Sequence, residues 1–323
     1  MRVLVGCWLL AGVVAAQGQM RSVAITVDDL PCANCAPMNA DGTPRHGVLV
    51  ETNRKLVAGL VKAGAPVTGF VITRTAEEAG KSGHEALDLW LDAGFDLGSH
   101  SYSHPNFSEI SAEEMETEIA RADSYLYPLL AAKGKKVRFF RFPYNSTGDT
   151  QAKHDSVAEF LKVSNYGHQV AACTIDNSDY VFAGAYAVAV GKNDMATAEK
   201  IRREYLAYSA TKIDFYAALN RRVLGYEPPE VMLLHDSLLN ADSVRDVLEL
   251  FRKRGYKFVS LSEAQSDPAY AIPDTYVTKY GPMWGYRWAQ EKKLGQLWIK
   301  EEEPEEWVEK YANGDATGVP GKP

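Results

Sequence analysis

Two adjacent aspartates, Asp28 and Asp29, end a short apolar segment near the start of the chain. Four later apolar segments also end in side chains that can bind a metal or transfer a proton. These ends are SHSYSHP at 99–105, RFPYN at 141–145, DNSDY at 176–180 and HD at 235–236. Carboxylates and imidazoles can together hold a divalent cation or act as general acid and base. One such end is ordinary, but five in succession indicate a reaction centre.

The pair His100 and His104 has the spacing of metal ligands. Pro105 biases His104 away from helical geometry, so the pair is expected on a turn. Two imidazoles four residues apart converge easily on one ion. With one carboxylate they make three ligands and leave positions open for water and substrate. Each residue also has a plainer interpretation, as a turn residue or a strand cap. The other histidines (46, 84, 154 and 168) are expected to be structural or exposed.

A Cys-x-x-Cys pair, Cys32 and Cys35, follows the two aspartates. Pro31 precedes it and a stretch rich in Pro, Asn, Asp and Gly follows, which is typical of a loop. A local disulfide that braces this loop is the favoured interpretation, and free thiols are the alternative. A zinc site made of cysteines would need a second pair, which the sequence does not contain.

The first residues have the pattern of an export signal. Arg2 is followed by fourteen uncharged residues that end in Ala15 and Ala16. We therefore predict a signal peptide over residues 1–17 and export to the periplasm or the medium. An uncleaved or lipid anchor is the alternative. The run is shorter than the roughly 20 apolar residues that span a bilayer, so no transmembrane segment is expected in the mature protein.

The overall composition is that of a globular protein. The chain has 323 residues, of which 46% are hydrophobic and 24% are charged. Its net charge is -7 and no basic run occurs. Nucleic-acid binding depends on neutralising phosphates with Lys and Arg, so a nucleic-acid partner is not expected.

Short β-branched segments alternate with helical patterns, which predicts an α/β fold of parallel βαβ units, either an open sheet or a barrel. A helix over 111–134 begins with a capping box formed by Ser111 and Glu114. The expected strands are 22–27, 65–72, 94–99, 137–142, 168–175, 231–234 and 257–261. The carboxyl ends of parallel strands line one face, so the polar ends described above should meet there.

Two segments do not follow the alternation. Residues 180–230 contain a predicted helical insertion, in which apolar residues recur at helical spacing and indicate a buried face. Residues 265–323 form a C-terminal extension that holds four of the six tryptophans. These tryptophans are expected to pack on the body of the protein, with stacking on sugar rings as the alternative. The last residues are expected to be disordered.

In sequence order, the polar ends resemble the motifs of the polysaccharide deacetylases, the NodB-homology proteins of carbohydrate esterase family four. The matching segments are TVDD at 26–29, HSYSH at 100–104, RFPY at 141–144, DNSDY at 176–180 and LLHD at 233–236. The resemblance covers about residues 22–262. It implies a distorted seven-stranded (β/α) barrel, and we assign the catalytic domain to residues 18–264. It also implies hydrolysis of acetyl groups on an N- or O-acetylated polysaccharide or oligosaccharide by metal-activated water.

The resemblance also implies a role for each motif residue. The metal ligands would be Asp29, His100 and His104, with Zn²⁺ as the expected cation and Co²⁺, Ni²⁺ or Mn²⁺ as alternatives. The catalytic group would be Asp28 as general base, Arg141 as its orienting partner, His235 as general acid and Asp179 as the partner of His235. Residues Tyr144, Tyr180 and Leu234 would contact the substrate or the developing oxyanion.

Four positions depart from the usual family pattern. Val27, Leu30, Asn145 and Tyr180 stand where Phe, Gly, Gly and Trp are usual. These changes leave every catalytic type in place, but they alter the pocket wall and leave the glycan open beyond chitin and peptidoglycan.

Three other functions remain as alternatives. A hydrolase of cyclic imides or other amides would share the fold, and a glycan-binding protein would lack catalysis. An iron oxygenase could use two histidines and one carboxylate, but its usual His-x-Asp order is absent.

Overall fold

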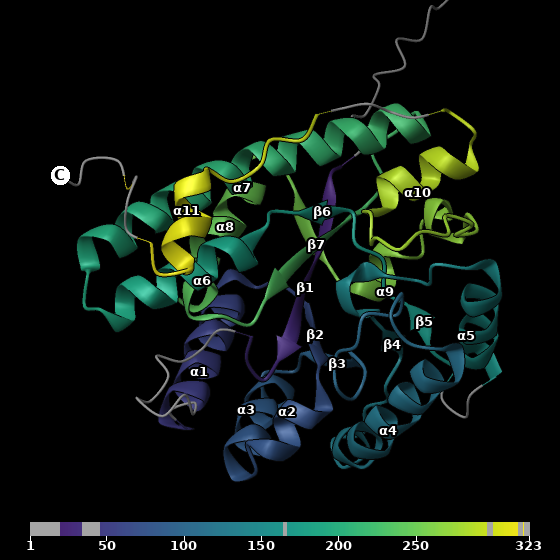
Figure 1. Ribbon diagram of the computed structural model, residues 1–323, viewed down its shortest axis with the longest axis horizontal. Coiled ribbons are helices and arrows are strands. Elements are labelled where there is room, and N and C mark those ends of the chain that lie inside the picture. The colour runs from purple at the N-terminus through teal and green to yellow at the C-terminus, as the bar shows by residue number, and fades with distance from the viewer. Residues whose placement is uncertain (1–19, 34–45, 164–166, 296–299, 316–318, 320–323) are drawn as a thin grey trace, which may run out of the picture.

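The computed structural model describes residues 20–33, 46–163, 167–295, 300–315 and 319 (Figure 1). The predicted signal peptide and Cys35 lie outside these residues. Cys32 lies inside them and is disulfide-bonded. None of the described helices has both the length and the apolar character needed to cross a membrane.

A curled, parallel half-barrel sheet forms the centre of the molecule (Figure 1). Its strands run in the order β5-β4-β3-β2-β1-β7-β6, and β8 pairs with β1 beside them. The strands are β1 (Ser22–Leu30), β2 (Val67–Val71), β3 (Asp96–Ser99), β4 (Phe139–Phe140), β5 (Gln169–Val170), β6 (Ile175–Asp176), β7 (Glu230–His235) and β8 (Lys257–Val259). The predicted α/β class is therefore confirmed.

The expected strand over 168–175 is wrong as one element, because it is divided into β5 and β6 at opposite ends of the sheet. The backbone N–H of Ala171 donates to the carbonyl of Phe140 in β4 at 2.8 Å. Three residues later, the N–H of Thr174 donates to the carbonyl of Val231 in β7 at 3.0 Å. Residues 171–174 thus cross the opening of the half-barrel, and the described strands number eight instead of seven.

Helices cover the sheet and join its strands. They are α1 (His46–Ala63), α2 (Thr73–Glu78), α3 (Lys81–Asp92), α4 (Ala112–Ala131), α5 (Gln151–Val163), α6 (Asp179–Gly191), α7 (Met195–Leu224), α8 (Leu238–Lys253), α9 (Leu261–Ala264), α10 (Trp284–Glu291) and α11 (Glu306–Ala312). The 3₁₀ turns are η1 (Pro143–Asn145) and η2 (Pro268–Ala271). The predicted capping box at Ser111 is present at the start of α4.

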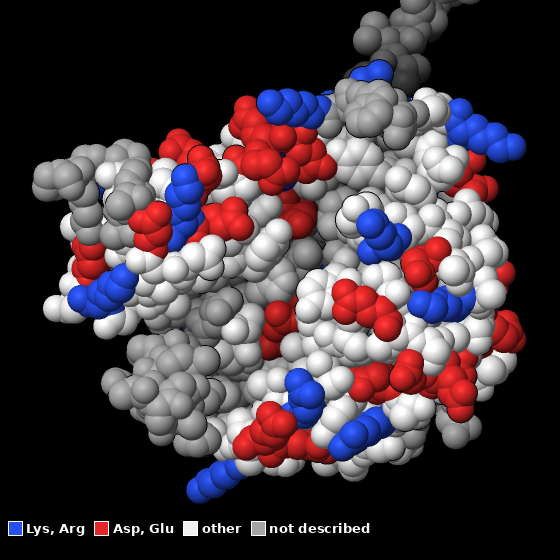
Figure 2. Space-filling view, viewed as in Figure 1, with Lys and Arg blue, Asp and Glu red and all other residues white. Residues whose placement is uncertain are grey.

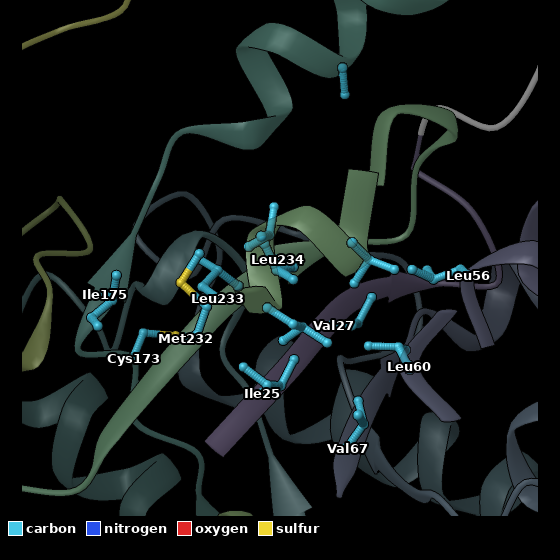
Figure 3. Close-up of a cluster of buried hydrophobic side chains, with 14 of the residues drawn as sticks. Ile25, Val27, Leu56, Leu60, Val67, Cys173, Ile175, Met232, Leu233 and Leu234 are labelled. Atoms are coloured by element: carbon cyan, nitrogen blue, oxygen red, sulfur yellow. The ribbon is translucent and has the colours of Figure 1, made fainter. Parts of the chain in front are cut away.

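The main hydrophobic core lies between the central strands and the helices packed on them (Figure 3). Figure 3 labels side chains from β1, α1, β2, the crossing segment, β6 and β7. They are Ile25, Val27, Leu56, Leu60, Val67, Cys173, Ile175, Met232, Leu233 and Leu234. Strands buried on both faces explain why these segments are almost continuously apolar in the sequence.

The helical insertion and the C-terminal extension both pack on this body. Helix α7 buries the face predicted for it, with Ile201 and Tyr205 fully enclosed. Helix α10 lies against α7 and α11 against α6 (Figure 1). Trp284, Trp288 and Trp307 are buried, as predicted for the extension. Trp298 lies outside the described residues. Among the last residues, which are expected to be disordered, Val319 is buried in the core, and residues 316–318 and 320–323 lie outside the described residues.

The face of the protein drawn in Figure 2 has no stripe of basic side chains. Acidic side chains gather in clusters there, whereas lysines and arginines are scattered among them (Figure 2). This distribution agrees with the net charge of -7. It gives no electrostatic footprint for nucleic acid on that face.

Glu230 at the start of β7 offers a test of the fold that is independent of the site. It is fully buried, and Asn220 donates a hydrogen bond to its Oε2 at 2.7 Å. Burial raises its pKa from 4.5 to about 8. The folded state therefore keeps a proton that the unfolded chain releases. Stability from this group is complete below pH 4.5 and is lost as pH rises through about 8.

We expect Glu230→Gln to raise the melting temperature by several degrees at pH 8.5 and to change it much less at pH 5. The neutral amide can still accept the Asn220 hydrogen bond without being ionised. Thermal unfolding of both proteins across this pH range measures the difference. An equal change at both pH values would contradict the buried, proton-holding Glu230.

Candidate active site

The polar strand ends meet at one end of the sheet, as predicted. In β1, Asp28 is directly opposite His235 of β7 in the parallel register. In β3, Ser99 is opposite Phe140 of β4, so His100 and Arg141 follow side by side. The β1, β3, β4 and β7 motifs are therefore brought together by strand pairing, although they are far apart in sequence.

Backbone strain is concentrated at this end of the sheet. Eight described non-glycine residues have a positive φ, and six belong to the motif segments. These six are Asp29, Ser101, His104, Tyr144, Asn145 and Ser178. A left-handed conformation costs of order 1–3 kcal/mol for such residues and persists only where the surroundings hold it. Strain of this kind often accompanies functional sites, because it directs side chains to positions that regular helices and strands do not allow.

Asp29, His100 and His104 form a group that fits a divalent cation. Oδ1 of Asp29 lies 3.4 Å from Nε2 of His100 and 3.3 Å from Nε2 of His104. Two ligands bound tetrahedrally to zinc at about 2.0–2.1 Å would be about 3.3–3.4 Å apart. The ligand atoms of the three residues all lie within 4.8 Å of one another. The spacing therefore matches a shared ion.

The protonation states of this group also suit a metal. His100 donates from Nδ1 to the carbonyl of Arg141 at 2.8 Å, which leaves the Nε2 lone pair directed at the group. Burial, together with the neighbouring His100, lowers the pKa of His104 to about 4, so its imidazole is neutral near pH 7. Burial would raise the pKa of Asp29, but the side chain of His100 and the nearby imidazoles hold it well below its usual range. Buried Oδ1 of Asp29 accepts no hydrogen bond from the described residues.

Asp28 lies beside this group but has a different partner. Its side chain is 5% exposed, and Nη1 of Arg141 lies 3.4 Å from Oδ1 and 3.3 Å from Oδ2. Arg141 itself is 1% exposed. Its guanidinium therefore holds the Asp28 carboxylate in one orientation next to Asp29, His100 and His104.

Arg141 is in turn held by groups that the sequence interpretation did not identify. Its Nη2 donates to Thr26 Oγ1 and to the carbonyl of Ala172, both at 3.2 Å, and its Nη1 contacts Sγ of Cys173. Burial raises the pKa of Cys173 to about 12, so the thiol keeps its proton. Thr26 could have been found from the sequence, because it is two residues before Asp28 on the same face of a strand.

His235 is held by a carboxylate and a second polar layer. Its Nδ1 lies 2.6 Å from Oδ1 of Asp179, and its backbone N–H donates to Oδ2 of Asp179 at 2.7 Å. Asn240 on α8 donates to Oδ2 of Asp179 at 2.5 Å and to the carbonyl of His235 at 2.8 Å. Tyr205 donates to Oδ1 of Asn240 at 2.7 Å. Asn240 was missed, although a polar residue in the first turn of a buried helix was a usable signal.

The carboxylate sets the charge of His235. Burial alone would lower the pKa of this imidazole, but the charge and hydrogen bond of Asp179, together with the charges of Asp29 and Asp28, raise it to about 10. With Nδ1 bound to Asp179, Nε2 is the nitrogen that has a proton to donate.

The three predicted substrate residues lie in different environments. Tyr144 is 60% exposed, and its ring lies edge-on to His104 with centroids 4.7 Å apart. Tyr180 is 55% exposed and packs edge-on against His235 at 6.0 Å. The structure does not bring the side chain of Leu234 to this surface, because it is fully buried in the core (Figure 3).

Comparisons with known proteins find similarity to polysaccharide deacetylases. The family model for polysaccharide deacetylase matches residues 15–163, which include the first three motifs but not Asp179 or His235. A peptidoglycan-N-acetylglucosamine deacetylase from Bacillus cereus is 26% identical over 141 residues. That alignment covers 44% of this chain and 42% of the relative, so the chain matches less than half of that protein's length.

Solved structures support the same fold over a longer stretch. A carbohydrate esterase family four pseudoenzyme from Bacillus anthracis is 17% identical, with a TM-score of 0.50, over 76% of this chain and 66% of that chain. A mutant of this pseudoenzyme with restored enzymatic activity is 18% identical, with a TM-score of 0.51, over 76% and 68%. At this identity the likeness concerns the fold alone. The motifs, the match to the family model over residues 15–163 and the fold are therefore similar to those of the polysaccharide deacetylases.

Proposed function

We propose that the protein is a metal-dependent hydrolase that removes acetyl groups from an N- or O-acetylated glycan. The observation that carries the proposal is the complete set of side chains at one end of the sheet. A group that fits a cation is flanked by a buried carboxylate held by Arg141 and by an imidazole held by Asp179. The three parts would supply a metal ion, a general base and a general acid, which amide or ester hydrolysis uses.

Asp28 is the proposed general base. A divalent cation held by Asp29, His100 and His104 would polarise the acetyl carbonyl and lower the pKa of a water molecule. Asp28, fixed by Arg141, accepts a proton from the attacking water. The backbone N–H of Tyr144 would donate to the carbonyl oxygen as it gains negative charge.

His235 is the proposed general acid. The raised pKa keeps the imidazole protonated at neutral pH, with Nε2 free to give the proton. Protonation of the leaving nitrogen or oxygen completes the cleavage, since an unprotonated amide or alkoxide is a poor leaving group. Asp179 orients the ring and stabilises its charge.

The proposal includes the cation, the substrate and the location. Two imidazoles and one carboxylate suit Zn²⁺ best, with Co²⁺, Ni²⁺ or Mn²⁺ as alternatives. The named activity of the Bacillus cereus relative supports an N-acetylated glycan, and exposed Tyr144 and Tyr180 are suited to contact sugar rings. Export remains a prediction from the first 17 residues.

A non-catalytic function is the alternative that the comparisons raise, because the structural neighbour from Bacillus anthracis is a pseudoenzyme. The presence of Asp28 with Arg141, and of His235 with Asp179, favours catalysis in this chain. Hydrolysis of a cyclic imide or another amide on the same fold is the second alternative.

Acetate release tests the proposal. We expect the purified protein to release acetate from at least one member of a panel of acetylated chitin, xylan and peptidoglycan fragments. A chelator should stop the release, and added Zn²⁺, Co²⁺, Ni²⁺ or Mn²⁺ should restore it. Imide substrates in the same panel separate the second enzyme function. Binding of these glycans without acetate release, at full metal occupancy, would refute the proposal and favour a glycan-binding protein.

A further inference from the structure

The C-terminal extension reaches the turn at residues 143–147, which contains Tyr144. Arg287 on α10 is 1% exposed, and its guanidinium points into this turn. Nη2 donates to the carbonyl of Asn145 at 2.6 Å, and Nη1 donates to Oγ1 of Thr147 at 2.8 Å. Nη1 also bonds Oδ2 of Asp274 at 2.6 Å. One buried cation thus ties two residues of the turn to the extension.

The turn has an unusual backbone that needs such support. Tyr144 has φ 56° and ψ 17°, and Asn145 has φ 52°, so two successive non-glycine residues are left-handed. Asparagine tolerates this conformation better than most residues, which fits Asn145 where the family often has glycine. Tyrosine has no such preference. Contacts from outside the turn must therefore hold Tyr144 in place.

Gly281 provides a second contact from the extension. A Cβ atom at this position would lie 1.7 Å from the carbonyl oxygen of Tyr144 and 2.7 Å from the carbonyl carbon of Asn145. Only glycine allows the two backbones to approach this closely. Further along, the N–H of Trp284 donates to the carbonyl of Cys173 at 2.8 Å, beside Arg141.

We propose that Asp274, Gly281 and Arg287 form a clamp that fixes the left-handed turn at Tyr144 and Asn145, with Arg287 as the positioning residue. The clamp rests on the proposed function, in which the N–H of Tyr144 stabilises the oxyanion. The extension therefore positions a residue of the reaction centre in addition to covering the core.

The position of Tyr144 makes its placement matter for the reaction. Its ring contacts His104, a proposed metal ligand, at 4.7 Å between centroids. A shift of the turn moves both the N–H that faces the substrate and the aromatic wall beside the cation. Misplacement by about 1 Å at such a position can cost about 10²-fold in rate.

Three variants and one control test the clamp. Arg287→Ala removes the guanidinium that bonds to the turn. Arg287→Lys replaces the planar guanidinium with a single ammonium group. Gly281→Ala displaces the turn directly, because the added methyl group would overlap its backbone. Val308→Ala is the matched control, because Val308 is fully buried in α11 of the same extension and belongs to no part of the site. Backbone hydrogen exchange of residues 143–147, melting temperature, and kcat and KM for acetate release are measured for each.

We expect Arg287→Ala and Gly281→Ala to exchange faster in the turn and to lose about 10–100-fold in kcat, with a much smaller change in KM. Arg287→Lys should recover part of kcat, since a lysine keeps the charge but not the fork. Val308→Ala should lower the melting temperature and leave turn exchange and kcat as in wild type. If Arg287→Ala does not fold, Gly281→Ala and Arg287→Lys carry the same test.

Two results would overturn the clamp. One is unchanged exchange of residues 143–147 in folded Gly281→Ala and Arg287→Lys. The other is faster exchange with a kcat no lower than that of Val308→Ala. A wild-type protein that releases no acetate from any glycan would refute the proposed function instead, while hydrogen exchange would still show whether the extension holds the turn.

Discussion

Asp28→Asn is expected to lower kcat for acetate release by about 10²–10⁴-fold, the usual contribution of a general base. Asparagine has the same shape as aspartate but cannot accept the proton. Arg141 is buried and retains its contacts with Thr26 and Ala172, so the variant should still fold. The three proposed metal ligands are untouched, and metal content should stay at the wild-type level.

The neighbouring substitution Asp29→Asn provides the contrast. Asp29 supplies the oxygen that lies 3.3–3.4 Å from both imidazoles, so this variant should lose metal at chelator concentrations that Asp28→Asn withstands. Acetate release and bound metal, measured on both variants after the same dialysis, separate the two roles. Equal acetate release from wild type and Asp28→Asn would refute Asp28 as the base. Equal metal retention by the two variants would refute Asp29 as a ligand.

The sequence carried enough information to predict which strand ends meet at one end of the sheet. Apolar segments of strand length mark the strands, and polar residues directly after them mark one end of a parallel sheet. Asp28 and His235 are 207 positions apart in the chain (28 to 235), yet they are opposite each other because β1 pairs with β7 in parallel. Parallel pairing alone brings such ends together, so no detail of packing was needed.

The contacts that hold the site could not be predicted in the same way. Cys173 reaches Arg141 only because residues 171–174 leave the sheet and cross its opening. In the sequence these residues are part of one uniform apolar segment, so nothing marks the crossing. The alternation of apolar and polar residues predicts which face of a strand each residue occupies. It does not predict where a strand ends when the two halves of one apolar segment form hydrogen bonds with two different strands.

The C-terminal extension shows the same limit. Its tryptophans predicted packing on the body, and Trp288 is indeed enclosed. Nothing in the spacing indicated that Arg287 would reach Asn145, because the contact joins residues 142 positions apart and depends on the three-dimensional path of residues 272–283. Long-range contacts between irregular segments leave no periodic signal.

The charge of the proposed acid, His235, depends mainly on its hydrogen-bonded neighbour Asp179. Asp179 is fully buried, accepts the backbone N–H of His235 and contacts its Nδ1 at 2.6 Å. This carboxylate makes the largest contribution that raises the pKa of His235 to about 10 against the effect of burial. An acid must be protonated to act, so activity should fall as pH rises through its pKa.

Asp179→Asn is therefore expected to lower kcat at pH 7–8 by about 10²–10⁴-fold and to move the alkaline fall in activity from near pH 10 to lower pH. The shift goes to lower pH because the variant loses the negative charge that keeps the imidazole protonated. The pH profile of kcat measures it, with Asp242→Asn as control, since Asp242 lies on α8 but bonds Tyr186 instead of His235. An unchanged alkaline limb in Asp179→Asn would rule out His235 as the acid that Asp179 controls.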